Sequence, residues 1–158
     1  MKKFELTSEF VTFLGKTLFR IKALVSFGDV AEGELGGFIE RENNLDQSGD
    51  AWVYGDAWVY GDAQVCGDAR VFGDAQVFGN AWVQNCRDYS ATSCFGSENR
   101  TTTFFRTKDG GISVRCGCFY GTLREFREKV KERHGDSRLA KEYLMLADLM
   151  EFRLSKDE

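Results

Sequence analysis

One six-residue pattern repeats without a gap over residues 49–84 and constrains the fold more than any other feature of the chain. The copies read GDAWVY, GDAWVY, GDAQVC, GDARVF, GDAQVF and GNAWVQ. Ala and Val stand two residues apart in every copy, and an extended segment alternates its side chains between faces, so both point the same way. Gly and Asp tolerate the dihedral angles of tight turns. The pattern therefore predicts short strands that share an Ala–Val core face and bend after each strand.

This spacing resembles the hexapeptide-repeat family of left-handed parallel β-helices, in which three hexads close one triangular coil. The resemblance implies two regular coils for this array. Counted back in sixes, Ile39 and Leu45 fall on the Ala column, so we expect an irregular first coil to start near residue 31. Repeat arrays need covered ends and about three units to bury a continuous core. The flanking segments are therefore expected to cap the array.

Alternation of apolar and polar residues predicts a β-hairpin on each side of the array. Before it, residues 10–13 and 18–21 read as the two strands of an N-terminal hairpin. After it, residues 101–107 and 112–119 read as strands joined by the turn-rich segment 108–111. Both hairpins are expected to act as caps.

Two helices are predicted at the end of the chain. Thr122 and Glu125 form a capping box at the start of the first, which stops near His134 and Gly135, and Ser137 can cap the second. The second helix has two apolar faces, one with Leu139, Tyr143, Leu146 and Met150 and the other with Met145, Leu149 and Phe152. Two apolar faces imply two packing partners, one of which we expect in another subunit.

The sequence thus predicts a mainly β chain with a C-terminal α part. The expected architecture is a short left-handed parallel β-helix of hexapeptide repeats, capped by an N-terminal β-hairpin and by a C-terminal β-hairpin with a helical hairpin. The expected divisions are 1–30 for the N-terminal cap, 31–86 for the repeat β-helix, and 87–158 for the C-terminal module.

Composition narrows the possible partners. The net charge of −4 disfavours direct nucleic-acid binding, and no apolar run reaches membrane-spanning length. The start MKKFELTSEF lacks the apolar stretch of a signal peptide, so we expect a cytoplasmic protein. The five cysteines have no disulfide-framework spacing and are expected to be thiols. Whether four of them bind zinc stays open at this point: Cys86, Cys94, Cys116 and Cys118.

Segments outside the repeats carry a second resemblance. LFRIKALVSFGDV, GELGGFIERENNL, and VRCGCFYGTLREF followed by HGDSRLAKEYL are similar to small proteins common in bacteriophages and prophages. There a similar N-terminal hairpin, GDA-type repeats and a terminal hairpin with two helices occur together. The resemblance implies a phage setting and the cytoplasm of a bacterial host, but no reaction.

The sequence gives little support for an enzyme. Hexapeptide acyltransferases use a catalytic His, and the carbonic anhydrases of this architecture bind zinc through three. This chain has one His, His134, in the last turn of a predicted helix, where the helix dipole and exposed carbonyls favour it. We therefore expect a non-enzymatic protein without metal or cofactor.

Aromatic residues beside the core columns are expected to point outward. A face this apolar is rare on soluble monomers, which favours self-association, most simply as a homotrimer. The alternative is that terminal elements fold over it within one chain. The candidate interface residues are Trp52, Trp58, Trp82, Tyr54, Tyr60, Phe72 and Phe78.

The C-terminal strands carry the candidate ligand site. Arginine forks, hydroxyls and aromatic rings suit phosphates and bases, although an ordinary solvated strand face is the alternative. The candidate residues are Arg100, Thr101, Thr103, Arg106, Arg115, Phe119 and Tyr120.

These features lead to a functional hypothesis. We expect a phage-type counter-defence protein that sequesters a small anionic, nucleotide-like ligand of the host. Alternatives are a protein that inhibits a host defence complex, such as a CRISPR effector, or a structural scaffold. A hexapeptide acyltransferase is less favoured, because its catalytic residues are not legible.

Overall fold

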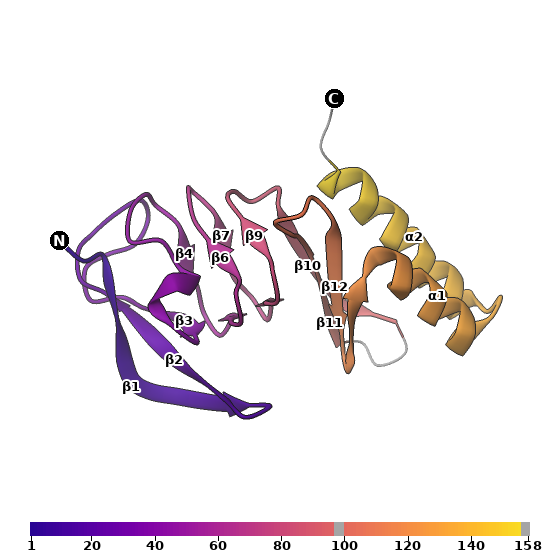
Figure 1. Ribbon diagram of the computed structural model, residues 1–158, viewed down its shortest axis with the longest axis horizontal. Helices are drawn as coiled ribbons and strands as arrows, with labels where there is room; N and C mark the ends of the chain where they lie inside the picture. Colours follow the sequence, from indigo (N-terminus) through magenta and orange to yellow (C-terminus); the bar gives the residue numbers. More distant parts are fainter. Residues whose placement is uncertain (97–99, 156–158) are drawn as a thin grey trace. The chain divides into compact units, whose positions relative to one another are not determined.

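The computed structural model describes residues 1–96 and 100–155. The chain separates into two compact units, Met1–Cys86 and Arg87–Glu158. Most of the regular structure is β, and two helices close the described chain (Figure 1). The N-terminal unit contains β1 (Phe4–Phe13), β2 (Lys16–Ala23), β3 (Leu35–Ile39), the short 3₁₀ helix η1 (Glu42–Asn44), β4 (Trp52–Val53), β5 (Trp58–Val59), β6 (Gln64–Val65), β7 (Arg70–Val71), β8 (Gln76–Val77) and β9 (Trp82–Val83). The C-terminal unit contains β10 (Tyr89–Phe95), β11 (Arg100–Arg106), β12 (Ile112–Cys116), β13 (Phe119–Thr122), α1 (Leu123–His134) and α2 (Arg138–Leu154).

The hexads form parallel ladders between residues eighteen positions apart. β4 pairs with β7, β5 with β8 and β6 with β9, all in parallel. Every Ala and Val of the core columns is at most 1% exposed, which confirms the predicted core face. At Gly67, one of the bends between strands, glycine is needed for two reasons. Gly67 has φ of +65°, and a Cβ there would lie 2.4 Å from the carbonyl oxygen of Gln84, so a larger residue would push neighbouring coils apart.

One prediction about the first coil is wrong. Ile39 pairs with Val59, and Leu45 bridges to Val65, so both lie on the Val column and not on the Ala column. These pairs are twenty residues apart because the stretch between Leu45 and Val53 holds two more residues than a hexad. The extra length lets the Gln47 side-chain oxygen accept hydrogen bonds from the backbone N–H groups at the start of β1, at 2.7 and 3.3 Å.

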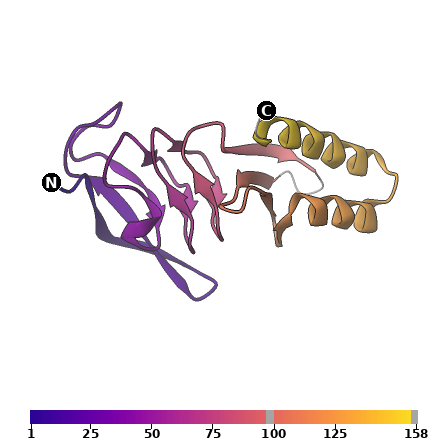
Figure 2. The ribbon, with the colours of Figure 1, turned by 45° about the horizontal axis from the view of Figure 1, so that its top comes forward.

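The N-terminal hairpin caps the array as a continuation of its sheet. β1 and β2 pair antiparallel, β2 pairs antiparallel with β3, and β3 pairs in parallel with β5 (Figures 1 and 2). The hairpin turns at Leu14 and Gly15, which both have positive φ. Lys3 is buried above the end of the array, and its ammonium donates to the carbonyls of Ser48, Gly49 and Ala51 at 3.4, 3.3 and 2.8 Å. Burial lowers the pKa of Lys3 below its usual value, against the pull of neighbouring carboxylates.

The C-terminal unit is an antiparallel sheet with two helices on one face. The strand order is β10-β11-β12-β13, and α1 and α2 run side by side (Figure 2). The predicted helices, the Thr122–Glu125 capping box and the Ser137 cap are confirmed. The strand prediction was incomplete, because β10 was missed and Phe119 belongs to a further strand beyond a tight turn. The helix-facing core contains Phe104, Val114, Leu123, Phe126, Val130, Ala140, Tyr143, Leu146, Ala147, Met150 and Leu154.

Neither α1 nor α2 combines the length and the apolar character that crossing a bilayer requires, and the same holds throughout the described residues.

Candidate functional site

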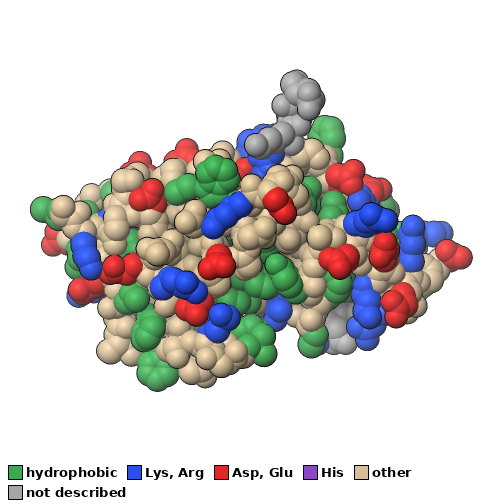
Figure 3. Space-filling view, in the orientation of Figure 1, with side chains coloured by type: hydrophobic (Ala, Val, Ile, Leu, Met, Phe, Trp, Pro, Cys, Tyr) green, Lys and Arg blue, Asp and Glu red, His purple; other side chains and the backbone are tan. Residues whose placement is uncertain are grey.

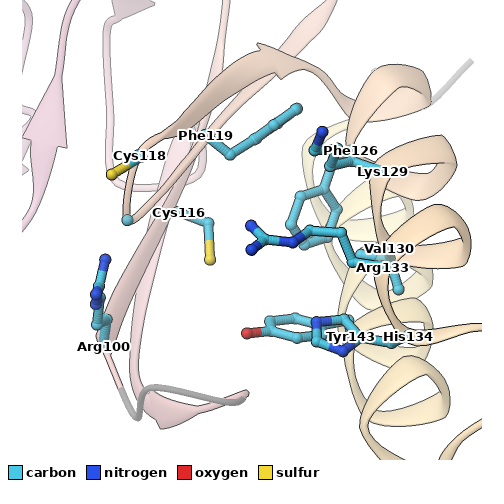
Figure 4. A pocket seen from close by; sticks show the side chains of 11 residues that line it. Arg100, Cys116, Cys118, Phe119, Phe126, Lys129, Val130, Arg133, His134 and Tyr143 are labelled. Atoms are coloured by element: carbon cyan, nitrogen blue, oxygen red, sulfur yellow. The ribbon is translucent and has the colours of Figure 1, made fainter.

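A cavity of about 270 Å³ lies within the C-terminal unit, between the β12–β13 hairpin and α1 (Figure 4). We call it the cationic pocket, because three cations line it, Arg100 on β11 and Lys129 and Arg133 on α1. The other lining residues are Cys116, Gly117, Cys118, Phe119, Phe126, Val130, His134 and Tyr143. Figure 4 shows the Arg133 guanidinium and the Tyr143 hydroxyl pointing into the space across from the Cys116 thiol.

The tight turn of the β12–β13 hairpin sets the position of Arg100. Cys116 pairs with Phe119, which leaves Gly117 and Cys118 as the two turn residues. Gly117 has φ of +58°, a conformation that glycine adopts at little cost. A Cβ at Gly117 would lie 2.5 Å from Nη1 of Arg100, so the bare glycine also leaves room for the guanidinium against the turn. The CGC sequence therefore both reverses the chain and places a cation at the pocket.

The other two cations come from one face of α1. Phe126, Lys129, Val130 and Arg133 follow one another at spacings of three, one and three residues, which places them on the same side of a helix. Phe126 and Val130 are buried in the core, while Lys129 and Arg133 are exposed at the rim. The apolar stripe that docks α1 on the sheet therefore also carries the two cations to the cavity.

Aromatic rings form much of the remaining wall. The Phe119 and Phe126 ring centroids are 5.8 Å apart, and Phe126 meets Tyr143 edge to face at 5.9 Å. His134, at the end of α1, stacks on Tyr143 with a centroid distance of 5.6 Å and an interplanar angle of 25°. Because Tyr143 is almost fully buried, it holds the imidazole in place. The wall therefore combines aromatic rings with cations, and both kinds of side chain come from the strands as well as from α1.

Among the described residues that line the cavity there is no carboxylate. Lys129 lies 3.8 Å from Glu132, but both side chains are exposed, so this ion pair neutralises little of the positive charge. On the face that Figure 3 shows, Lys, Arg, Asp and Glu side chains are interspersed over the two helices. The described side chains that line the cavity differ from this mixed surface, because those that are charged are all cations. They also differ from the chain as a whole, whose net charge is −4.

The structure brings only some of the seven candidate ligand residues together. Arg100 and Phe119 line the cationic pocket. Thr103, Arg115 and Tyr120 are direct cross-strand neighbours, and alternation places them on the sheet face opposite to Phe119. The seven residues therefore do not form one site.

The other two candidates have local partners. Arg106 forms an ion pair of 2.9 Å with Asp88, whose side chain is only 4% exposed. A buried carboxylate needs such a partner, so Arg106 has a structural role. The Thr101 hydroxyl lies 2.9 Å from the Ser93 hydroxyl on the neighbouring strand.

Sequence reasoning missed Lys129, Arg133 and Tyr143 as pocket residues. Cations on a predicted surface helix are normally solvated, so their number alone carries no signal. A usable signal was the spacing of Lys129 and Arg133 beside the apolar Phe126 and Val130, which predicts cations at the edge of a buried stripe. Because the sequence predicts the helices as caps, the candidate site that it indicates lies on the strands alone.

The N-terminal hairpin covers much of the aromatic surface beside the core columns. Trp52 is fully buried, with Phe4 and Phe27 packed edge to face on its ring. Phe13 packs on Trp58 and on Tyr60, with centroids 5.0 and 6.0 Å apart.

The remaining aromatic residues divide into buried and exposed ones. Tyr60 stacks on Phe78 at 4.8 Å, and both are nearly buried. Tyr54 is half-buried and meets Phe72 edge to face at 6.3 Å. Phe72 and Trp82 stay 54% and 40% exposed. A partner subunit could reach these two without moving the cap, but not Trp52, Tyr60 or Phe78.

The cysteines give no described metal centre. Within residues 1–96 and 100–155, no three or more His, Cys, Asp or Glu residues are grouped so as to hold a metal ion. Cys66, Cys86, Cys116 and Cys118 are free thiols, and the Cys94 side chain lies outside the described part of the chain. The Thr102 hydroxyl donates a hydrogen bond of 3.3 Å to Cys116 Sγ.

Comparison with known proteins bears on the repeat alone. A family model described as the YdcK β-solenoid repeat matches residues 63–77, within the hexad array. Comparison with the curated proteins gave no match. The chain is thus similar to a β-solenoid repeat protein over this segment, in agreement with a mostly β fold that has two C-terminal helices.

Proposed function

We propose that the C-terminal unit binds a small anionic ligand with a flat ring, such as a nucleotide, in the cationic pocket and does not turn it over. The observation that carries this proposal is the composition of the pocket wall. Three cations and the rings of Phe119, Phe126 and Tyr143 line one cavity, and the part of its lining that the structure describes contains no carboxylate.

Local charge makes anion binding credible in an acidic chain. Charges separated by more than about 8 Å are largely screened at physiological salt, so the net charge of −4 acts weakly on an anion inside the pocket. Arg100 and Arg133 each offer a planar fork of donors that matches phosphate or carboxylate oxygens. Both sides of an anion held between β11 and α1 would therefore meet donors.

The volume and the aromatic wall favour a small ligand with a ring. Ligand pockets commonly measure about 300–1,000 Å³, and a cavity of about 270 Å³ lies just below this range, which favours a small ligand. Stacking of a base on an aromatic side chain contributes about 1–3 kcal/mol. Phe119 at the cavity edge offers such a surface.

The arrangement supports binding more than catalysis. A nucleophilic Cys or Ser needs a base that a third group orients. The His134 ring stacks on Tyr143, and the described lining residues offer no carboxylate to orient it. Together with the phage resemblance of the sequence, this supports sequestration of a host ligand. The free thiols support a cytoplasmic setting, where cysteines stay reduced.

We also infer that the hexad array closes as a left-handed triangular β-helix. The supporting observation is the eighteen-residue offset of all three parallel ladders, which corresponds to three hexads per coil. The resemblance to hexapeptide-repeat proteins supports the left hand.

Calorimetry on matched variants tests the binding proposal. The titrants are AMP, GMP, CMP and UMP, with adenosine and inorganic phosphate as partial ligands. Arg133→Ala removes a pocket cation, and Arg124→Ala removes an exposed arginine of the same helix that does not line the pocket. A charge-assisted hydrogen bond contributes about 1.5–3 kcal/mol, so Arg133→Ala should weaken binding by about tenfold or more, while Arg124→Ala leaves it unchanged.

Several outcomes would contradict the proposal. Equal affinities of the two variants would place the ligand elsewhere, and no heat with any nucleotide would remove the proposed ligand class. Release of phosphate or base during incubation, followed by ³¹P NMR, would show turnover. If a host protein co-purified with a chain that binds no nucleotide, inhibition by protein contact would be the better account.

A further inference from the structure

The lining of the cationic pocket changes along helix α1. Phe126 is seven residues from Arg133, or about 10.5 Å along the helix axis, so these two residues mark different ends of the cavity. Phe119 packs on Phe126 with a centroid distance of 5.8 Å, and we call this the aromatic end. Arg133 and the Tyr143 hydroxyl lie at what we call the polar end (Figure 4). A ligand that fills the cavity therefore meets rings at one end and hydrogen-bonding groups at the other.

The polar end holds a cation that no described carboxylate neutralises. Elsewhere on α1, Arg124, Arg127 and Lys129 each form an ion pair with a carboxylate. Within the described chain, no ion pair or side-chain hydrogen bond is formed by Arg133. Its guanidinium points into the cavity, as the Tyr143 hydroxyl does (Figure 4). Because the planar fork of arginine matches phosphate oxygens, a phosphate at the polar end would gain charge-assisted hydrogen bonds.

The aromatic end offers a base a surface on which to stack, but little that distinguishes one base from another. Reading a base requires hydrogen bonds of fixed geometry to its edge. The Phe119 side chain has no polar atom with which to make them, and stacking tolerates every base because each has a flat face. Lys129, three residues from Phe126, carries its ammonium on a flexible stem, so it contributes charge without a fixed geometry.

We propose that the cationic pocket recognises its ligand by the phosphate and not by the base, and thus takes the nucleoside monophosphates as a class. This inference rests on the proposed function of the same pocket. The phosphate lies at the polar end against Arg133, and the base stacks on Phe119. Apolar contacts discriminate between related ligands by about 10–200-fold, whereas a site that hydrogen-bonds one ligand rejects its analogue by about 10⁴-fold or more.

Calorimetry on the full wild-type chain tests this without any variant. AMP, GMP, CMP and UMP should have dissociation constants within about tenfold of one another, with the purines bound more tightly because their larger rings stack better. Adenosine and uridine lack the phosphate, so each should bind at least about tenfold more weakly than its monophosphate. Ribose 5-phosphate keeps the phosphate but lacks the base, and should bind about tenfold to a hundredfold more weakly than AMP.

Two variants assign the two ends of the cavity. Arg133→Ala should weaken all four monophosphates by a similar factor of about tenfold or more. Phe119→Leu keeps an apolar side chain but removes the ring, so it should weaken the purines most and narrow the spread among the four bases. Phe10→Leu is the matched control, because Phe10 is a 57% exposed ring on the N-terminal hairpin, and it should leave every affinity unchanged.

Folding is checked separately for the variant at the aromatic end. Phe119 packs on Phe126 in the core of the C-terminal unit, so circular dichroism and thermal unfolding must show that Phe119→Leu is folded. The comparison of the six nucleotides and nucleosides with ribose 5-phosphate uses the wild-type chain and does not depend on this variant.

Binding of one monophosphate a hundredfold or more tightly than the other three would overturn this inference and leave the proposed function standing. Adenosine that binds as tightly as AMP would overturn it as well, because recognition would then lie in the ring. If none of the four monophosphates binds, the proposed function itself fails. Base-selective binding and absence of binding therefore distinguish the failure of this inference from the failure of the proposal on which it rests.

Discussion

Val65 provides a direct test of the core of the repeat array. It is 1% exposed, pairs with Val83 in the β6–β9 ladder and bridges to Leu45 on its other side. Val65→Asp would place a carboxyl group in the middle of the stack. The inward columns above and below contain only Ala and Val, apart from Ile39 and Leu45 at the capped end, so no partner for the charge is at hand.

The cost can be worked out in two parts. A carboxyl group with an ordinary pKa of about 3.9 must shift by about 3 units to stay neutral at pH 7, which costs about 4 kcal/mol. Loss of the buried valine side chain adds about 1.5–3 kcal/mol. The sum of about 6 kcal/mol is comparable to the whole stability of a typical domain, about 5–15 kcal/mol.

Thermal unfolding followed by circular dichroism measures the effect, with Gln64→Asp as the matched control. Gln64 precedes Val65 and is exposed on the outer face of the same strand. Val65→Asp should be unfolded or strongly destabilised at 25 °C, and Gln64→Asp should stay within about 0.5 kcal/mol of the wild type. Equal stabilities of the two variants would refute the inward assignment of the Val column.

Two further predictions concern the cap of the array. Gly→Ala is usually favourable in a strand, but Gly37→Ala should destabilise the chain, because the added Cβ would lie 2.5 Å from the Ala57 carbonyl oxygen. A melting temperature of Gly37→Ala at or above that of the wild type would contradict this close approach. Because burial lowers the pKa of Lys3, the folded state holds fewer protons than the unfolded state between the lowered value and 10.5. The free energy of unfolding should therefore rise with pH through that window in the wild type. Urea titrations should show no such rise in Lys3→Met. Identical pH profiles of the two proteins would contradict the buried ammonium.

The repeat could be predicted because its determinants are local. Each hexad carries its own strand, turn and core pair, so the period alone identifies the inward residues. The assignment of Ile39 and Leu45 to the Ala column was wrong because their register is not set by local sequence alone. Two extra residues before Val53 change the register, and their position depends on contacts with β1 that are more than forty residues away in sequence.

The helices could be predicted from the sequence and the site could not, again because only the helices have local determinants. Thr122 and Ser137 mark helix starts through contacts with residues three positions away, which the sequence shows directly. The cationic pocket depends instead on the approach of Arg133 to Arg100, which only the packing of α1 on the sheet brings about. Gly117 and Cys118 form a turn within residues 112–119, a range that the sequence predicts as one strand, so the start of a further strand at Phe119 could not be predicted.

An NMR titration tests most directly whether the cationic pocket binds an anion. Amide ¹⁵N–¹H spectra of the full chain would be recorded as AMP is added to about 1 mM, a concentration that populates even weak complexes. Ligand binding in the pocket predicts saturable shifts confined to residues that line it, in the turn 116–119 and the helix segment 129–134. Absence of shifts at this concentration, or shifts confined to the hexads 49–84, would contradict a nucleotide site in the C-terminal unit.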